Sequence, residues 1–457
     1  MIERLARFRA AISGVELRDD EATLAIYGHD ESDMGDFPPA LVVFPRSTSE
    51  VQAVMRACNT HGVPLTPVGA RSGKSGGSLP VRGGVSMSLE RLDRIVELRP
   101  GDLTATVQPG VLLEVFQKAV EEVGLFYPPD PNSAAICTLG GNIAENAGGP
   151  RALKYGVTRD YVLGLEWVLP TGELLQIGHR TIKGVAGYDL VGLFVGSEGT
   201  LGVATEITVK LLPRPPAVAT ALITFGSVVE AAEAVTRVLL AGMLPRCLEL
   251  LDDVAISAID GQGYTFPTGC GACLIVEVDG PSDESTLVEL NRVAETCAAR
   301  GAQETLLAMD RDQRERLWAV RRLVSPALRA LKKFKVSEDI VVPRSRMPEA
   351  IARFKEVGHD LGLTVATYGH AGDGNLHTNV LYAGPSEKPL VDQALEAIMK
   401  ITVALGGTIT GEHGVGVSKR RFLSLEQSPA VIDWQWRLKV LADPQVIMNP
   451  GKIFPDR

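Results

Sequence analysis

The sequence predicts an α+β protein that is divided into two domains. Apolar residues at helical spacing and short extended apolar segments both recur along the 457 residues, and a compact domain usually holds roughly 100–200 residues. The clearest linker is Pro213–Pro216, because its prolines interrupt helices and strands. We therefore predict a first domain at residues 1–216, a second at 217–445, and a return of residues 446–457 to the first domain.

Each element of the first domain is predicted from its local pattern. Val51, Val54 and Cys58 recur at helical spacing, Ser49 is the candidate N-cap, and Gly62 ends the helix. Apolar runs between turn signals predict strands, and a Thr-Gly pair predicts a hairpin turn. In chain order we expect a helix at 48–62, an extended segment at 63–68, a strand at 104–108, a helix at 112–123, a hairpin at 161–175 and a strand at 201–212.

Beyond the linker the same patterns predict a mixed layer of helices and strands. The expected strands lie at 219–225, 274–278, 364–368 and 376–381. The expected helices lie at 228–241, 284–300, 311–333, 348–361, 390–405 and 430–441.

Charge and hydropathy exclude several classes of protein. The chain has 46 Lys and Arg against 55 Asp and Glu, interleaved without a basic stripe, which argues against binding to nucleic acid or to an anionic membrane. It has neither a run of 18 apolar residues nor a signal-peptide pattern, so we expect no transmembrane segment. We expect a cytoplasmic protein, with peripheral membrane association through a partner as the alternative.

The six cysteines do not suggest a disulfide scaffold. Cys270 and Cys273 form a CxxC pair, but a zinc or iron–sulfur site needs more thiolates nearby, so buried thiols are favoured. The cysteine run of a ferredoxin-type cluster is missing, so we expect no iron–sulfur cluster in this chain.

Glycines gather in three clusters, at 67–78, 127–149 and 196–202. Glycine-rich loops let successive N–H groups converge on an anion, and three of them suit a large ligand with a pyrophosphate. The first cluster is not a P-loop, because only three residues separate Gly69 from Gly73 and because Leu79-Pro80 follows where a helix should begin. The nicotinamide G-x-G-x-x-G fingerprint is also missing.

These clusters resemble the FAD-binding domain of the vanillyl-alcohol-oxidase/PCMH flavoproteins. The resemblance is carried by Pro67–Ser78, Gly140–Gly149 and Gly196–Val203. It extends from about Pro38 to the C-terminus and is strongest with FAD-dependent D-2-hydroxy-acid dehydrogenases, namely the glycolate oxidase catalytic subunit, D-lactate dehydrogenase and D-2-hydroxyglutarate dehydrogenase. It implies an FAD-binding PCMH-type domain followed by an α+β substrate (cap) domain.

The resemblance also implies which residues contact FAD. They are Val68, Gly69, Ala70, Arg71, Ser72, Gly73, Ser75, Gly76, Gly77, Pro131, Thr138, Gly141, Asn142, Gly148, Tyr155, Gly156, Glu198, Gly199, Gly202, Val203, Ile207 and Asn449. Relatives commonly have glycine where Arg71 stands, and we expect a negative φ there, since positive φ disfavours a side chain. Because 67–78 has no histidine for covalent attachment, we expect non-covalent FAD.

Two further motifs hold three of the seven histidines, Tyr368–Asn379 and Gly411–Gly414. His370 and His377 flank a Gly-Asp-Gly turn between two expected strands, which can bring both imidazoles together. Two imidazoles and the Glu412 carboxylate suit Zn²⁺ best, with Mn²⁺ and Fe²⁺ as alternatives. A hydrogen-bonded turn without metal is the competing interpretation.

In the resembling dehydrogenases the positions of His370, His377 and Glu412 ligate a divalent metal, and the position of His413 is the base. A bound cation lowers the pKa of the substrate hydroxyl, His413 accepts the proton, and the hydride goes to flavin N5, leaving a 2-keto acid. Arg321 matches the substrate-binding arginine, which suits a carboxylate; without the resemblance, a solvated helix face would be favoured for it. The other implied substrate residues are Ser325, Lys335, Asn379 and His413.

The resemblance therefore implies a small 2-hydroxy acid as substrate and an external electron acceptor, either an iron–sulfur subunit, an electron-transferring flavoprotein or a quinone. A homodimer or a hetero-complex would be compatible. Two alternatives stay open: a non-haem Fe(II) oxygenase that uses the same two histidines and glutamate, and a catalytically silent flavin-binding subunit.

Overall fold

The computed structural model describes residues 2–260, 262 and 265–456. The chain forms two compact units, of which unit 1 comprises Met1–Gly148, Val157–Arg214 and Glu412–Arg457, and unit 2 comprises Gly149–Gly156 and Pro215–Gly411. The passage between them at 214/215 lies in the predicted linker. Unit 1 resumes at Glu412 rather than at residue 446, and the short segment 149–156 belongs with unit 2, two features that the sequence patterns did not indicate.

Unit 1 contains a four-stranded sheet covered by helices. The strand order is β1-β2-β4-β3, with β2 and β3 parallel to β4. Its strands are β1 (Glu16–Arg18), β2 (Leu41–Phe44), β3 (Leu65–Val68) and β4 (Val85–Ser88), and helices α1 (Ile2–Ala11) and α3 (Thr48–His61) contribute to the same apolar core. The sheet brings the end of β3, where the first glycine cluster begins, to the carboxyl edge of a parallel pair.

Helix α3 shows how local sequence produces these elements. Val51, Val54 and Cys58 are fully buried, as their spacing predicted, and Gly62 ends the helix with a φ of 59°. The predicted cap was wrong. Ser47, not Ser49, is the N-cap, because its side chain accepts a hydrogen bond from the N–H of Glu50, three residues on.

A second, antiparallel sheet of unit 1 has the order β5-β6-β10-β8-β9. Its strands are β5 (Ile95–Arg99), β6 (Thr104–Val107), β8 (Val162–Val168), β9 (Leu174–Gly178) and β10 (Val203–Lys210). The predicted hairpin is β8 and β9, and Gly172 in its turn has a φ of 82°. The other elements of unit 1 are α2 (Glu21–Ile26), α4 (Leu113–Glu122), β7 (Leu125–Phe126), α5 (Leu139–Glu145), α7 (Leu190–Phe194), β11 (Leu212–Pro213), α14 (Leu423–Glu426) and α15 (Pro429–Ala442).

Residues 412–457 are attached to unit 1 by buried polar contacts. The Lys439 ammonium, on α15, donates to the carbonyls of Thr200 and Met448 and to the Asp443 carboxylate. Beyond the helix, Leu65 of β3 donates to the Ile447 carbonyl and accepts from the N–H of Asn449. Chain segments far apart in sequence therefore form one core.

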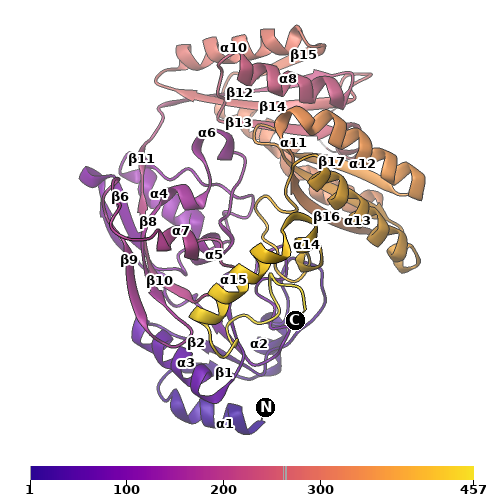
Figure 1. Cartoon of the computed structure of the whole chain (residues 1–457). Helices are drawn as coiled ribbons and strands as arrows, with labels where there is room; N and C mark the ends of the chain where they lie inside the picture. Colours follow the sequence, from indigo (N-terminus) through magenta and orange to yellow (C-terminus); the bar gives the residue numbers. More distant parts are fainter. Residues whose placement is uncertain (1, 261, 263–264, 457) are drawn as a thin grey trace. The chain divides into compact units, whose positions relative to one another are not determined.

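Unit 2 is built on a seven-stranded antiparallel sheet with the order β15-β12-β14-β13-β17-β18-β16 (Figure 1). Its strands are β12 (Ala217–Phe225), β13 (Cys247–Asp252), β14 (Ala272–Gly280), β15 (Ala302–Ala308), β16 (Phe334–Val341), β17 (Thr364–His370) and β18 (Asn375–Tyr382). The helices are α6 (Ala152–Tyr155), α8 (Val228–Leu240), α9 (Asp253–Ile259), α10 (Asp283–Ala298), α11 (Arg311–Leu331), α12 (Met347–Leu361) and α13 (Lys388–Ala404).

Two helices, α9 and α11, cover one face of this sheet. Their apolar side chains form one core with Leu251 of β13, Ile275 of β14 and Tyr368 of β17. All the helices predicted beyond the linker are present, and so are the four strands, but β13, β15 and β16 were not predicted. That omission matters, because β13 and β16 supply polar residues to the candidate site.

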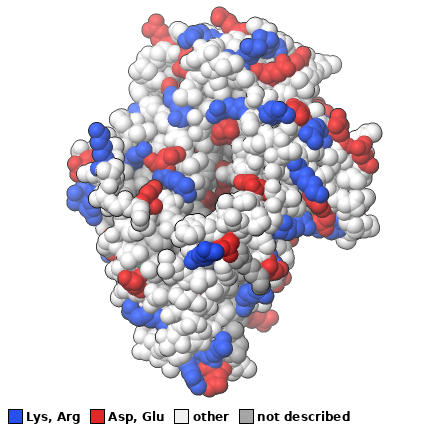
Figure 2. Space-filling model, viewed as in Figure 1, with Lys and Arg blue, Asp and Glu red and all other residues white. Residues whose placement is uncertain are grey.

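The surface agrees with the charge pattern of the sequence. Figure 2 shows basic and acidic side chains interspersed on the visible face, without a continuous basic patch. Among the residues that the structure describes, no helix is both long and apolar enough to cross a bilayer.

Candidate functional site

The first candidate site lies on the hairpin of β17 and β18. His370 is the last residue of β17 and His377 lies in β18, and the tight turn between them contains Gly374 at a φ of 86°. In the strand register His377 pairs with Tyr368, two residues before His370, so both imidazoles point to the same face. Their ring centroids are 5.2 Å apart. The predicted convergence of the two imidazoles is confirmed.

Glu412 completes this cluster. It directly follows Gly411, whose N–H donates to the buried Asp339 carboxylate at 2.8 Å. Asp339, on β16, also accepts from Asn375 Nδ2 at 2.5 Å, so it ties the turn before Glu412 to the histidine hairpin. Candidate ligand atoms of His370, His377 and Glu412 all lie within 4.8 Å of one another. This donor set fits a divalent cation.

The buried Glu249 is a site residue that the sequence did not predict. It lies on β13, opposite His370 in the register, and its side chain is fully buried. One carboxylate oxygen lies 2.5 Å from His370 Nδ1, and the other accepts from Arg321 Nε at 2.6 Å. Burial raises the pKa of Glu249, but the interactions with His370 and Arg321 outweigh burial and hold this pKa at about 2. The available signal was a glutamate within an apolar segment, Cys247–Asp252.

Arg321, on α11, is a buried cation and not part of a solvated helix face. Its guanidinium carbon lies 4.7 Å from the centroid of the Tyr368 ring, and the residue is 4% exposed. Its Nη2 atom has no hydrogen-bond partner among the described residues. A buried guanidinium nitrogen without a partner is energetically costly, and the guanidinium geometry suits a carboxylate.

Three other predicted substrate residues lie in the same unit. Lys335 Nζ, on β16, donates to Ser325 Oγ of α11 at 2.8 Å. Asn379, on β18, is fully buried; its Nδ2 donates to the His377 carbonyl, while its Oδ1 has no partner among the described residues. The structure therefore places Lys335 beside Ser325. It also leaves the Asn379 Oδ1 atom, two residues from His377, able to accept a hydrogen bond.

The three glycine clusters meet in unit 1. A Cβ added to Gly69 would lie 2.7 Å from Thr138 Oγ1, and one added to Gly199 would lie 2.6 Å from the Pro67 ring. Asn449 Nδ2 donates to the carbonyls of Gly77 and Glu198, which joins the first cluster to the third. These close approaches explain why glycine is needed in the predicted cofactor cradle.

Several buried polar atoms in this cradle lack a hydrogen-bond partner among the described residues. They are Ser75 Oγ, Asn142 Nδ2, Ser197 Oγ and Asn449 Oδ1. Each belongs to a residue at most 6% exposed. Because buried polar atoms are normally satisfied, this set fits a large polar ligand such as FAD. Ser75, Asn142 and Asn449 were predicted to contact it, and Ser197 lies in the third glycine cluster.

Arg71 adopts a backbone conformation opposite to the predicted one. Its φ is 59°, in the left-handed region that glycine favours. The prediction failed because it ignored tertiary compensation: the Arg71 guanidinium lies over the Tyr27 ring at 4.6 Å from the centroid. The left-handed conformation costs about 1–2 kcal/mol, and such a contact returns about 0.5–2 kcal/mol.

Glu198 has a role beside the predicted cofactor contact. Its two carboxylate oxygens accept from the N–H groups of Val415 and Gly416 at 2.7 and 2.6 Å. Glu145, a neighbouring residue that the sequence analysis missed, has an Oε2 atom without a partner among the described residues. Burial and repulsion from Glu198 raise the pKa of the Glu145 carboxyl well above its ordinary value. Glu198 therefore holds the segment that follows His413.

The other predicted cofactor residues divide between the units. Tyr155 and Gly156 belong to the segment grouped with unit 2, and the Tyr155 hydroxyl donates to Asp279 at 2.7 Å. Val68, Ala70, Ser72, Gly73, Gly76, Pro131, Gly141, Gly148, Gly202, Val203 and Ile207 belong to unit 1. In that unit a Cβ on Gly148 would lie 3.0 Å from Glu412 Oε2.

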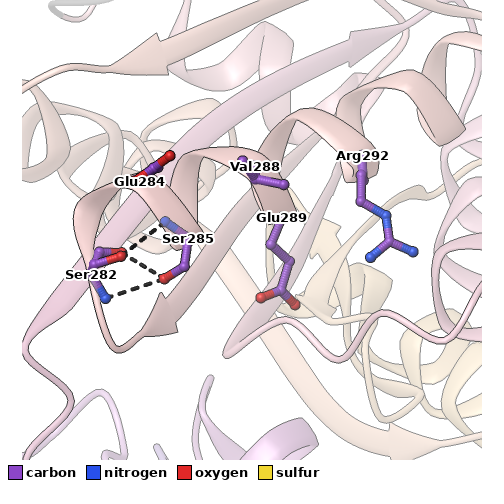
Figure 3. Close-up of a pocket in the computed structure, with 6 residues that line it drawn as sticks. All are labelled: Ser282, Glu284, Ser285, Val288, Glu289 and Arg292. Carbon is purple, nitrogen blue, oxygen red and sulfur yellow. Dashed lines mark hydrogen bonds between the residues drawn. The ribbon is translucent and has the colours of Figure 1, made fainter.

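A separate pocket of about 430 Å³ lies along α10, lined by Ser282, Glu284, Ser285, Val288, Glu289 and Arg292 (Figure 3). Ser282 and Ser285 hydrogen-bond each other as the capping box of this helix. All the lining residues belong to one helix and its cap, and none of them is a predicted site residue. The pocket is therefore not the candidate functional site.

Comparison with known families gives this arrangement a context. The family described as FAD linked oxidases, C-terminal domain, matches residues 214–453, and the FAD binding domain family matches residues 39–178. The chain belongs to the FAD-linked oxidases. These matches confirm the flavoprotein family and the FAD-linked oxidoreductase class that the resemblance implied. The oxygenase alternative leaves both matches unexplained.

Relatives of this FAD-linked oxidase cover almost the whole chain. It is 40% identical to glycolate oxidase subunit GlcD of Bacillus subtilis, over 97% of this chain and 95% of the relative. It is 34% identical to D-lactate dehydrogenase of Anaerostipes hadrus, over 99% of this chain and 97% of the relative. The solved structure of p-cresol methylhydroxylase, with 19% identity, matches with a TM-score of 0.81 over 100% of this chain and 97% of that chain, which confirms the fold alone.

Proposed function

We propose that this FAD-linked oxidase oxidises a D-2-hydroxy acid of the lactate, glycolate or 2-hydroxyglutarate class to the 2-keto acid, with a divalent metal. The single observation that carries the proposal is the cluster of His370, His377 and Glu412, whose ligand atoms lie within 4.8 Å. Relatives named glycolate oxidase subunit, D-lactate dehydrogenase and D-2-hydroxyglutarate dehydrogenase support the substrate class.

The residues of this chain supply binding and proton transfer. Arg321 would bind the substrate carboxylate through its terminal nitrogens, with Ser325, Lys335 and Asn379 lining the same site. His413 would accept the hydroxyl proton on an imidazole nitrogen. His370, His377 and Glu412 would hold the cation, preferably Zn²⁺, which lowers the pKa of the hydroxyl. FAD, held without a covalent bond, supplies the acceptor for the hydride that leaves the α carbon.

The reduced enzyme must pass its electrons to a second protein or a small molecule. We propose an external acceptor, either an iron–sulfur subunit, an electron-transferring flavoprotein or a quinone. The word "subunit" in the name of the Bacillus relative supports a hetero-complex. A homodimer is the alternative, and sedimentation of the purified chain alone distinguishes the two.

The proposal is tested with a substrate panel. D-lactate, glycolate, D-2-hydroxyglutarate and the L enantiomers are added anaerobically, and the flavin absorbance is followed; kcat/KM is then ranked with an artificial dye acceptor. We expect one D acid to bleach the flavin fastest. A flavin that no acid bleaches would instead support a catalytically silent subunit.

Two variants test the assigned roles. His413→Ala should keep FAD and metal but lose turnover by about 10²–10⁴-fold, the usual contribution of a general base. Glu412→Ala should lower the metal content measured by elemental analysis. His359→Ala is the matched control, since the His359 side chain is 90% exposed on α12, and it should change neither value. Full activity of His413→Ala would refute the base assignment.

A further inference from the structure

We propose that Glu249 is a positioning residue that orients both His370 toward the metal and Arg321 toward the substrate carboxylate. This inference rests on the proposed function and adds to it a residue that neither the sequence motifs nor the resemblance indicated. It is carried by one buried carboxylate whose two oxygens contact two different functional side chains.

The position of Glu249 is set by the sheet. Strand β13 lies between β14 and β17, and Glu249 faces His370 in the register. Leu251, two residues later on the same face, belongs to the core beneath α11, the helix that carries Arg321. Glu249 therefore lies between the strand that carries His370 and the helix that carries Arg321, and it has no exposed surface.

The contact with His370 determines which imidazole nitrogen carries the proton. An ionised carboxylate can only accept, so the hydrogen bond of 2.5 Å places the proton on His370 Nδ1. The lone pair is then on Nε2, so a cation would bind at that nitrogen. Carboxylates that accept from the second nitrogen of a metal-binding histidine also fix the ring and raise its basicity.

The contact with Arg321 determines which guanidinium nitrogens remain for substrate. Glu249 accepts a hydrogen bond from Arg321 Nε at 2.6 Å, and the ring of Tyr368 lies against the guanidinium. These two contacts hold the planar group in place and leave Nη2 without a partner among the described residues. Without Glu249 the Arg321 cation would be buried and uncompensated, and its side chain would turn away toward solvent.

The chain contains a matched control on the neighbouring strand. Glu277, on β14, is also buried, accepts from Trp318 Nε1 of α11 at 2.8 Å and lies 3.2 Å from Arg246 Nε. It shares with Glu249 the sheet, the facing helix and an arginine partner. Its carboxylate contacts Thr220, Trp318 and Arg246, none of which is a proposed metal or substrate residue. The loss of Glu277 therefore measures the structural cost alone.

The experiment measures Mn²⁺ binding and kinetics on the flavin-loaded enzyme. The dissociation constant for Mn²⁺ is determined by equilibrium dialysis for wild type, Glu249→Gln, Glu249→Asp and Glu277→Gln, and KM and kcat are measured at saturating Mn²⁺. We expect Glu249→Gln to weaken Mn²⁺ binding about 10–100-fold and to raise KM more than it lowers kcat. Glu249→Asp should recover part of both losses, and Glu277→Gln should leave both values within about twofold.

The outcomes separate this inference from the proposed function. If wild type binds Mn²⁺ and Glu249→Gln binds it equally well, the positioning role is overturned while the metal site stands. If wild type oxidises the acid but binds neither Mn²⁺ nor Zn²⁺, the proposed metal site falls, and the inference with it. Should Glu249→Gln not fold, Glu249→Asp decides alone: an unchanged dissociation constant and KM overturn the inference.

Discussion

Replacing Glu198 by alanine tests whether this residue holds the segment that contains the proposed base. Both carboxylate oxygens accept from backbone N–H groups, Val415 at 2.7 Å and Gly416 at 2.6 Å, and Glu198 is 6% exposed. A hydrogen bond to a charged group contributes about 1.5–3 kcal/mol. Losing both should therefore ease local opening of residues 412–418 by about 3–6 kcal/mol, because two buried N–H groups lose their acceptor.

Amide hydrogen exchange measures this local opening directly. Since 1.4 kcal/mol is about tenfold in an equilibrium constant, peptides covering 412–418 should lose protection by about 10²–10⁴-fold in Glu198→Ala. Alanine can occupy the backbone φ of 51° no worse than glutamate, so added strain does not confuse the result. Glu206→Ala, at a half-buried position on β10, is the control. Unchanged exchange in a folded Glu198→Ala would refute the reasoning.

Two further changes probe backbone strain and pH dependence. Arg71→Gly relieves the strain of a φ of 59° but removes the contact with Tyr27, so the midpoint of thermal unfolding should move by less than about 4 °C; a larger fall would mean that Arg71 has another role. Burial raises the pKa of Asp252, the N-cap of α9, from 3.8 to about 6. Between these pH values the folded protein binds more protons than the unfolded chain, so stability falls as pH rises, by about 3 kcal/mol at 1.36 kcal/mol for each pH unit. Asp252→Asn should flatten the dependence of calorimetric unfolding on pH between 4 and 6, and an unchanged slope would contradict this.

The sequence alone determined the local elements and the local part of the site. Helical spacing located α3, and the Gly-Asp-Gly turn brought His370 and His377 together, because both depend on residues close in the chain. The glycine clusters likewise indicated a large ligand with a pyrophosphate, since such a cradle needs glycine wherever backbone approaches closely. The family resemblance that these clusters carry then implied the flavoprotein class.

Only the tertiary structure decided which distant side chains meet. Glu249 contacts a histidine 121 positions away, because β13 lies beside β17 in the sheet, and strand order cannot be read from local periodicity. The same reason explains why Arg321 is a buried cation and not a solvated one, and why Arg71 tolerates a positive φ above the Tyr27 ring. The burial of Arg321, its pairing with Glu249 and the relief of backbone strain at Arg71 all depend on side chains that are close in space. The fold brings these side chains together from segments that are far apart in the sequence.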